Sequence, residues 1–355
     1  MRKESAGQLD IGIIAEPTAA HLDFYLETIA GCRGIGAIAY AAAGEAASPS
    51  LPEAVQPGAM QRYDTPEAML RDFRPRLAIV LVEPAQAPQW ISAALRAGCH
   101  VLAEKHPGVR LEDIEPLALE AEARGLRLEL TFTSRNHPAV TKAAELLCEG
   151  SLGNVYAADV VIVTDQTRLR DPHYRASWRA DRARSGGGFL MAQGIHYLDL
   201  LLHLTGARVT RVSGLCNNAG GQPVRIEDSV AAALELDSGA LATFHGGYYM
   251  DSGAQSGITL WTSGGWLHLD LGAGGSLTLY REGGAATESW NYDGSFVEQP
   301  MVPFFEDVIE RIRGGLPPVM TPEYGLHVLR TVFAIYQSAA DRAVAVVEFP
   351  LSTGV

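Results

Sequence analysis

The stretch IGIIAEPTAAHLDFYLETIAGCRGIGAIAY, residues 11–40, decides the fold of the first part of this chain. It opens with an apolar run at residues 11–15, continues with a helical pattern over residues 18–30, and closes with a second apolar run at residues 35–40. Apolar runs of strand length that alternate with amphipathic segments are typical of βαβ units, in which consecutive strands lie parallel in one sheet. We therefore expect a parallel sheet covered by helices.

The same alternation continues to residue 132. Strands are expected at residues 77–82, 100–103 and 127–132, with helices at residues 88–97 and 111–124 between them. Gly98 and Gly125 follow these two helices, at positions where glycine commonly ends a helix. The pattern predicts an α/β Rossmann-type domain with a parallel sheet over residues 8–132.

The pattern changes beyond residue 132, where short strands follow one another with few helices between them. Helices are expected at residues 138–148, 189–204 and 322–341, and strands at residues 155–163, 210–216, 229–236, 240–249, 258–262, 266–270, 276–280 and 345–349. Successive strands joined by Gly-rich turns are typical of antiparallel pairing. We therefore expect residues 133–355 to form a second, α+β domain with a large, mostly antiparallel open sheet.

Composition argues against several classes of function. The formal net charge is −13 and no long run of Lys or Arg opposes it, so nucleic acid and anionic membranes are not expected partners. The N-terminal segment MRKESAGQLD lacks the apolar stretch of a signal peptide, and no apolar run is long enough to span a membrane, which indicates a cytoplasmic protein. The four cysteines lie far apart, and neither they nor the histidines have the spacing of a metal site, so no metal is expected.

The connection after the first strand departs from the usual dinucleotide-binding pattern. The glycines of GxGxxG allow a tight turn and let backbone amides approach a pyrophosphate, whereas this chain has Ala15-Glu16-Pro17-Thr18-Ala19-Ala20. Pro17 has no amide hydrogen and Glu16 adds a negative charge, which weakens the expectation of a bound nucleotide. The amides of Thr18, Ala19 and Ala20 nevertheless predict a helix N-terminus that attracts anions.

The first candidate catalytic side chain is Lys105, in the run Ala103-Glu104-Lys105-His106-Pro107. This run follows a strand at the edge where open α/β sheets bind ligands. A charged side chain at that edge indicates a ligand-binding or catalytic site. An ordinary surface ion pair between Lys105 and Glu104 is the structural alternative.

The second candidate is His196, at the end of a segment that starts at Ser185. A run of three glycines at residues 186–188 opens a helix, and His196 falls on its third turn. Gly194 inside this helix indicates that another group approaches closely. A helix histidine hydrogen-bonded to Asp199, one turn further on, is the structural alternative.

Together these segments resemble the Gfo/Idh/MocA family, the relatives of glucose-fructose oxidoreductase and inositol dehydrogenase. The resemblance extends over nearly the whole chain. Its motifs are the strand followed by Glu104-Lys105, the RxHP run at residues 135–138, Trp178-Arg179, the helix from the three glycines to His196, and a C-terminal helix near Glu323. It implies a Rossmann domain followed by an α+β domain whose open sheet forms homodimers or homotetramers.

The resemblance also implies roles for individual residues. Lys105 and His196 are the expected catalytic pair, beside the nicotinamide and the reacting carbinol, and Ala192 stands where the family has Asp or Asn. Gln193, Asp199 or Tyr174 could replace that side chain. The expected substrate-binding residues are Arg135, Tyr174, Trp178, Arg179, Gln193 and Asp199. The expected cofactor-binding residues are Ala15, Glu16, Pro17, Thr18, Ala19, Tyr40, Glu83, Pro84, Glu104 and Lys105.

The implied chemistry is a hydride transfer between a secondary alcohol and NAD or NADP. His196, neutral near physiological pH, would take the hydroxyl proton, and Lys105 would stabilise the developing alkoxide. Tyr40 and Ala41 stand where an acidic residue would hold the ribose, so the sequence does not distinguish NAD from NADP.

An arginine-rich segment precedes the His196 helix. It contains Arg168, Arg170, Arg175, Arg179, Arg182 and Arg184. The planar guanidinium suits carboxylates and phosphates, so an anionic substrate is one explanation. A solvated loop or a contact between subunits is the other.

Three functions remain open from the sequence. The first is an NAD(P)-dependent oxidoreductase acting on a sugar, a polyol or a related hydroxy compound. The second is an enzyme without net redox change, in which transient oxidation enables elimination, epimerisation or glycoside cleavage. The third is a binding or regulatory homologue that has lost ordinary cofactor binding, which the altered connection at residues 15–20 and Ala192 would permit.

Overall fold

The computed structural model describes residues 7–16, 19, 21–44, 60–272, 275–281, 286–292 and 301–349. The chain divides into two compact units. The first comprises Met1–Thr131 and Met301–Leu326, and the second comprises Phe132–Pro300 and His327–Val355. The predicted boundary lies within a residue of the first division, but residues 301–326 belong to the first unit and not, as predicted, to the second.

The first unit is built on a six-stranded sheet in which every neighbouring pair of strands is parallel. In sheet order the strands are β3 (Met60–Tyr63), β2 (Ile35–Ala42), β1 (Leu9–Ala15), β4 (Leu77–Leu81), β5 (His100–Ala103) and β6 (Leu128–Leu130). The helices are α1 (Leu22–Gly31), α2 (Pro66–Asp72), α3 (Ala87–Arg96), α4 (Leu111–Ala123) and α10 (Met301–Gly314). This strand order is that of the Rossmann fold, with its switch point between β1 and β4.

Alternate residues of β1 face opposite layers of helices. Leu9, Ile11 and Ile13 belong to a buried cluster that includes residues of α1 and of α10. Gly12 faces the other way, where a Cβ atom would lie 2.7 Å from Pro75. Helix α10 joins this unit because its apolar residues complete the cluster beside α1. That long-range packing leaves no mark in the local sequence pattern, which explains the misplaced segment.

The second unit contains a nine-stranded sheet in which β7 and β10 are parallel and the other neighbouring pairs described are antiparallel. In sheet order the strands are β14 (Ala286–Asn291), β13 (Ser276–Tyr280), β12 (Gly265–Asp270), β11 (Ala254–Thr262), β7 (Val155–Asp165), β10 (Leu241–Met250), β9 (Ser229–Leu236), β8 (Val209–Asn217) and β15 (Ala345–Val346). The helices are α5 (Pro138–Cys148), α6 (Thr167–Arg170), α7 (Pro172–Ala176), α8 (Arg182–Ser185), α9 (Ile195–Thr205) and most of α11 (Pro322–Asp341), with shorter turns at Thr133–Asn136, Trp178–Ala180 and Leu190–Gly194.

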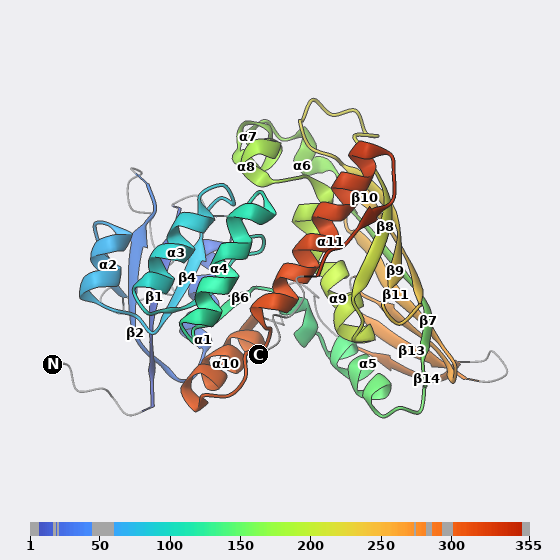
Figure 1. The fold of residues 1–355 in the computed structure, drawn as a ribbon, viewed down its shortest axis with the longest axis horizontal. Helices are drawn as coiled ribbons and strands as arrows, with labels where there is room; N and C mark the ends of the chain where they lie inside the picture. The colour runs from blue at the N-terminus through green and yellow to red at the C-terminus, as the bar shows by residue number, and fades with distance from the viewer. Residues whose placement is uncertain are drawn as a thin grey trace. The chain divides into compact units, whose positions relative to one another are not determined.

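Helices cover one face of this sheet. Figure 1 shows α5, α9 and α11 along that face, and among the described residues no helix lies along the other. Strand residues therefore alternate between buried and accessible: on β7, Val160 and Ile162 are buried while Val161 is exposed. The predicted mostly antiparallel open sheet is confirmed.

Several elements differ from the sequence expectation. Strands β3 and β14 and helices α2 and α10 were not predicted, and α1 begins at Leu22 instead of residue 18. The arginine-rich segment predicted as a loop contains the short helices α6, α7 and α8, of which α7 and α8 begin at aspartates whose side chains accept backbone N–H groups. The last strand pairs only over Ala345–Val346.

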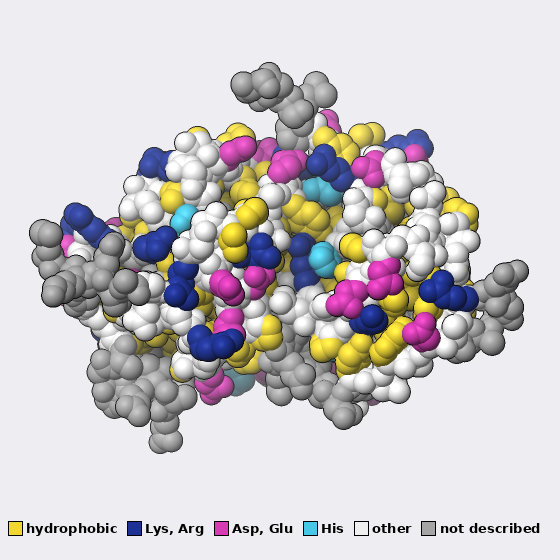
Figure 2. Space-filling model, turned by 90° about the horizontal axis from the view of Figure 1, so that it is seen from below, with side chains coloured by type: hydrophobic (Ala, Val, Ile, Leu, Met, Phe, Trp, Pro, Cys, Tyr) yellow, Lys and Arg dark blue, Asp and Glu magenta, His cyan; other side chains and the backbone are white. Residues whose placement is uncertain are grey.

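Side chains of both charges lie on the face of the molecule that Figure 2 draws. On the face drawn in Figure 2, Lys and Arg side chains lie interspersed with Asp and Glu. Across the described part of the chain, none of the helices has both the length and the apolar character needed to cross a bilayer.

Candidate active site

Predicted cofactor-binding residues lie along one edge of the parallel sheet of the first unit. Ala15 ends β1, Glu83 and Pro84 follow β4, and Glu104 and Lys105 follow β5. The strand ends are joined by backbone bonds: the Glu16 N–H donates to Leu81 O over 3.0 Å, and the Glu104 N–H donates to Val80 O over 3.0 Å. Because β1, β4 and β5 are adjacent and parallel, their carboxyl ends meet at one edge.

Helix α1 begins at Leu22, later than the predicted start at residue 18. The Ala19 N–H donates to Glu16 O over 3.0 Å, and the Leu22 N–H donates to Ala19 O over 3.1 Å. The amide of Ala19 is therefore used within a turn. Pro17, Thr18 and Ala20, which also belong to the predicted anion-binding connection, lie outside the described residues.

Tyr40 lies inside the core and not at the end of its strand. Strand β2 continues to Ala42, and Tyr40 is 2 % exposed in the cluster shared with α1 and α10. Burial raises the pKa of its phenol to about 12. Among the described residues its hydroxyl has no hydrogen-bond partner. Two residues of β2, Ala41 and Ala42, therefore lie between Tyr40 and the end of the strand.

Glu104 is held from two sides. The Tyr25 hydroxyl on α1 donates a short hydrogen bond to Glu104 Oε2, and Thr131 Oγ1 lies 3.5 Å from the same oxygen. Burial and the adjacent carboxylate raise the pKa of Tyr25 well above its usual value. Lys105, the next residue, is half-buried. The Tyr25 contact thus fixes the backbone from which Lys105 projects.

Glu83 is also engaged within the first unit. It is 5 % exposed, and the Gln86 side-chain amide donates to Glu83 Oε1 over 3.2 Å. Its carbonyl oxygen accepts the N–H groups of Gln86 and Ala87, at the start of α3. Glu83 therefore joins the end of β4 to the next helix.

In the second unit, His196 stands near the start of α9, directly after a π-helical turn at Leu190–Gly194. His196 is half-buried, and its ring meets the edge of Phe132 at 6.0 Å between centroids. A Cβ atom on Gly194 would lie 2.9 Å from Phe244, which confirms the predicted close approach. Ala192 and Gln193, in the π-helical turn, are both half-buried. Such turns occur frequently at functional sites.

Arg135 and Asp199 form a buried ion pair. The Arg135 Nε donates to Asp199 Oδ2 over 2.9 Å, and the Arg135 Nη2 makes a second, short contact with Oδ1. The two side chains are 9 % and 0 % exposed. Both were predicted to bind substrate, but the structure shows them bonded to each other, which attaches α9 to the turn at Thr133–Asn136.

Tyr174, Trp178 and Arg179 gather near the glycine turn with side chains from other elements. Arg179 lies over the Trp178 ring at 4.4 Å, and Arg168 lies over the Tyr248 ring at 5.1 Å. Burial raises the pKa of Tyr174, an effect that the two guanidinium groups oppose. The cluster combines aromatic faces, hydroxyl groups and positive charge.

Sequence reasoning missed two acidic residues, Glu227 and Asp228. Both are buried and both accept backbone N–H groups. Glu227 bonds the first turn of the His196 helix, where the three glycines lie. Two adjacent acids directly before the apolar alternation of β9 were the available signal, because a carboxylate in such a position needs partners.

Each of the two units contains a segment that matches a protein-family model. Residues 33–132 match the model of the oxidoreductase family with an NAD-binding Rossmann fold, and residues 140–268 match the model of the GFO/IDH/MocA C-terminal domain. The chain belongs to the Gfo/Idh/MocA family.

Relatives within the family include sugar and diol oxidoreductases. The chain is 30% identical over 153 residues to 1,5-anhydro-D-fructose reductase of Ensifer adhaerens, an alignment that covers 43% of this chain and 44% of the relative. It is 26% identical over 203 residues to trans-1,2-dihydrobenzene-1,2-diol dehydrogenase of Bos taurus, covering 57% and 56%. These matches span about half the length of the curated relatives.

A solved structure shows the same fold over nearly the whole chain. Levoglucosan dehydrogenase in complex with NADH and levoglucosan superposes with a TM-score of 0.82 at 16% identity, covering 96% of this chain and 99% of that one. The family match to the nucleotide-binding fold begins at residue 33, after the connection between β1 and α1. The family pattern is thus weakest where the glycines are missing.

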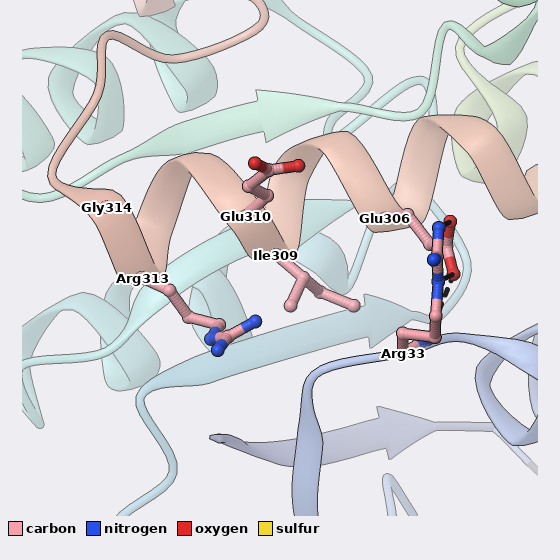
Figure 3. Close-up of a pocket in the computed structure, with 6 residues that line it drawn as sticks. All are labelled: Arg33, Glu306, Ile309, Glu310, Arg313 and Gly314. Atoms are coloured by element: carbon pink, nitrogen blue, oxygen red, sulfur yellow. Dashed lines mark hydrogen bonds and ion pairs between the residues drawn. The ribbon is translucent and has the colours of Figure 1, made fainter. Parts of the chain in front are cut away.

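A hollow in the first unit lies between α10 and the segment that precedes β2. It has a volume of about 500 Å³ and is lined by Arg33, Glu306, Ile309, Glu310, Arg313 and Gly314. Figure 3 shows the Arg33 guanidinium facing Glu306, with Nε 3.0 Å from Oε1. Arg33 precedes β2, so this hollow stands at the amino ends of the strands, opposite the edge that carries Lys105.

Among the described residues, neither metal-ligating side chains nor cysteines form a further candidate site. Within the described residues no group of three or more His, Cys, Asp or Glu side chains is arranged to hold a metal ion. The four cysteines are free; Cys99 is buried and Cys148 is exposed.

Proposed function

We propose that this protein is an NAD(P)-dependent oxidoreductase that interconverts a secondary alcohol and a ketone on a sugar, polyol or related hydroxy compound. The observation that carries the proposal is the place of Lys105, half-buried directly after β5 at the carboxyl edge of a parallel sheet with Rossmann strand order. That edge is where open α/β sheets bind their ligands.

The residues at this edge fit a dinucleotide in part. Ala15, Ala42 and Ala43 place small side chains around the ends of β1 and β2, so no bulky side chain stands at these strand ends. Glu83-Pro84 and Glu104-Lys105 would flank the nicotinamide half. The fit is poorest at residues 15–19, where no glycine is present and the Ala19 amide is already used. We therefore expect weaker binding of the pyrophosphate than a glycine loop provides.

The chemical roles of the two candidate residues follow from their side chains. When bound, the nicotinamide accepts or supplies the hydride. His196 acts as the general base that takes the hydroxyl proton of an alcohol substrate, and returns it in the reverse direction. The Lys105 ammonium stabilises the negative charge that develops on the substrate oxygen. The Arg168, Tyr174 and Arg179 cluster would favour a substrate that carries an acidic group.

Turnover of defined substrates tests this proposal. Purified full chain is assayed with NADH or NADPH and 1,5-anhydro-D-fructose, and with NAD or NADP and levoglucosan, trans-1,2-dihydrobenzene-1,2-diol, D-glucose or D-glucuronate. Lys105→Ala and His196→Asn should each abolish turnover, and neither should change the unfolding temperature by more than Lys142→Ala does. Lys142→Ala is the matched control, because Lys142 pairs with Glu145 on the surface of α5. Full activity in Lys105→Ala would contradict the assigned role.

A second candidate is a binding homologue without redox activity. The specific observation that favours it is the connection after β1, where the Ala19 amide is bonded to Glu16 O and no glycine occurs. If the protein is such a homologue, none of NAD, NADH, NADP and NADPH should bind, whereas the sugars named above should still raise the unfolding temperature.

We further propose that the open face of the nine-stranded sheet joins two copies of this chain. Its central residue Val161, opposite Gly257 and His245 on the neighbouring strands, is 38 % exposed, and Trp261 is 37 % exposed on the same face. Large apolar side chains gathered on one face are typical of interfaces. Val161→Asp should convert the oligomer to monomer in light scattering, while Leu119→Asp, at a 65 % exposed site on α4, should not. A wild-type monomer would refute the proposal.

A further inference from the structure

Glu227 supplies the hydrogen-bond acceptors for the start of the His196 helix. Its Oε2 accepts the Gly188 N–H over 2.8 Å, and its Oε1 accepts the Leu190 N–H over 3.0 Å. Its backbone carbonyl accepts the Phe189 N–H over 2.9 Å. The first N–H groups of a helix have no acceptor within the helix, so one residue satisfies three of them.

The surrounding residues are shaped around this carboxylate. The Tyr336 hydroxyl donates to Glu227 Oε1 over 2.6 Å, and the two side chains belong to residues that are 6 % and 7 % exposed. A Cβ atom on Gly187 would lie 2.0 Å from the Tyr336 hydroxyl, and one on Gly188 would lie 2.1 Å from Glu227 O. These glycines are thus explained by an internal carboxylate and its partner, without any bound ligand.

The electrostatic surroundings of Glu227 come from several elements. Arg182 of α8 lies over the Tyr336 ring at 4.9 Å. The Glu227 charge contributes to raising the pKa values of Cys216 of β8, Tyr174 of α7 and Tyr248 of β10, after the larger effect of their burial. Burial raises the pKa of Glu227, which the hydrogen bonds from Tyr336, Leu190 and Gly188 oppose. The donors around it favour the carboxylate form, because all of them direct a hydrogen atom at its oxygens.

Two contacts fix the helix upstream of His196. Glu227 holds the first turn at Gly188 and Leu190, and Gly194 packs against Phe244 at the end of the π-helical turn. Each residue of a helix rotates the side-chain direction by about 100°, so a shift in the first turn would redirect the imidazole.

We infer that Glu227 is a positioning residue for His196, which it serves by anchoring the N-terminus of its helix. This inference rests on the proposed role of His196 as the general base. Glu227 itself is not assigned any contact with substrate. The inference predicts that the charge and both acceptor oxygens of Glu227 are needed for the placement of His196, beyond what they contribute to stability.

The test compares Glu227→Gln with Asp228→Asn in the full chain. The Gln side chain keeps one acceptor but turns an N–H₂ group toward a donor. Asp228 is a matched control: it is 1 % exposed and accepts the Ala219 and Gly220 N–H groups, each over 2.8 Å, and does not bond the helix. Both variants should lower the unfolding temperature. Tyr336→Phe, which removes one donor and keeps the carboxylate, serves if Glu227→Gln does not fold.

With a substrate that the wild type turns over, Glu227→Gln should lower kcat about 10- to 100-fold while KM changes by less than about two-fold. Asp228→Asn should keep most of kcat. Tyr336→Phe should lower kcat in the same direction and less. Equal kcat losses in Glu227→Gln and Asp228→Asn, or no loss in Glu227→Gln, would overturn the inference.

A second measurement does not depend on turnover. The imidazole resonance of His196, assigned by its absence in His196→Asn, is recorded by NMR in isotope-labelled protein. The His196 ring contacts the Phe132 ring, with 6.0 Å between centroids, so a displaced imidazole in Glu227→Gln should have a changed chemical shift. Asp228→Asn should leave the resonance in place. An unchanged His196 resonance in Glu227→Gln would refute the positioning role, whatever the reaction turns out to be.

Discussion

Tyr25 and Tyr40 provide a comparison between two buried phenols in one core. Each is 2 % exposed and belongs to the same cluster of the first unit. The Tyr25 hydroxyl donates to Glu104, whereas the Tyr40 hydroxyl has no partner among the described residues. Removing a hydrogen bond to a charged group costs about 1.5–3 kcal/mol. Because Glu104 is partly exposed, we expect Tyr25→Phe to lose about 1.5 kcal/mol, at the lower end of that range.

The control is Tyr40→Phe, which removes a buried hydroxyl that makes no bond and should therefore leave stability unchanged or slightly higher. Thermal unfolding followed by circular dichroism measures both variants. A loss of about 1.5 kcal/mol lowers the Tm of a unit of this size by roughly 3–6 °C. Equal Tm values for the two variants, or a larger loss in Tyr40→Phe, would refute the assignment of the Tyr25 hydrogen bond. Tyr25→Phe should also lower turnover, because Glu104 adjoins Lys105.

Three further predictions concern buried charges. Burial raises the pKa of Glu129 to about 7. The contribution of this one group to stability is therefore fully present below its unfolded pKa of about 4.5, and up to about 3 kcal/mol of it is lost as pH rises through 7. Glu129→Gln should remove this part of the pH dependence in urea unfolding, and an unchanged dependence would contradict the assignment. Burial lowers the pKa of His327 to about 4, and its Nε2 accepts the Val209 N–H over 3.0 Å. The contribution of this group to stability is therefore fully present above about pH 6.5 and is lost as pH falls toward 4. His327→Gln should reduce the loss of stability on acidification, and an unchanged loss would contradict the assignment. Arg135→Met should cost about 3–5 kcal/mol because it removes the cation that is bonded to the buried Asp199 carboxylate. The double variant Arg135→Met with Asp199→Leu should recover most of that loss in urea unfolding, and a double variant as unstable as Arg135→Met would contradict the prediction.

The sequence predicted the elements whose local pattern is strong. Strand β5, helices α5 and α11, and strands β9 and β13 have the predicted bounds. Helix α2 was missed although Thr65 and Pro66 mark its start, with the Thr65 side chain accepting the Ala68 N–H over 3.2 Å. Its short length gave too little periodicity to recognise. Where α10 packs depends on contacts distant in the chain, which no local pattern encodes.

The sequence identified candidate site residues better than it identified which of them bond to each other. Lys105 directly follows a parallel strand, as its motif indicates. His196 lies in the predicted helical segment, but a π-helical turn at Leu190–Gly194 forms the first part of that segment and α9 begins only at Ile195. The sequence does not show that Arg135 bonds Asp199, or that Tyr40 lies in the core. It also did not reveal Glu227, because a helix cap supplied from residues distant in sequence is a tertiary feature.

The proposed function requires the carboxyl edge of the parallel sheet to bind a nicotinamide nucleotide although the connection after β1 has no glycine. The decisive measurement is a titration of the purified full chain with NADH and with NADPH, followed by the fluorescence of the reduced nicotinamide. We expect saturable binding of at least one of them, which Lys105→Ala weakens and Lys142→Ala leaves unchanged. No response to NADH, NADPH, NAD or NADP, in fluorescence or in the unfolding temperature, would refute the proposed function and favour a binding homologue.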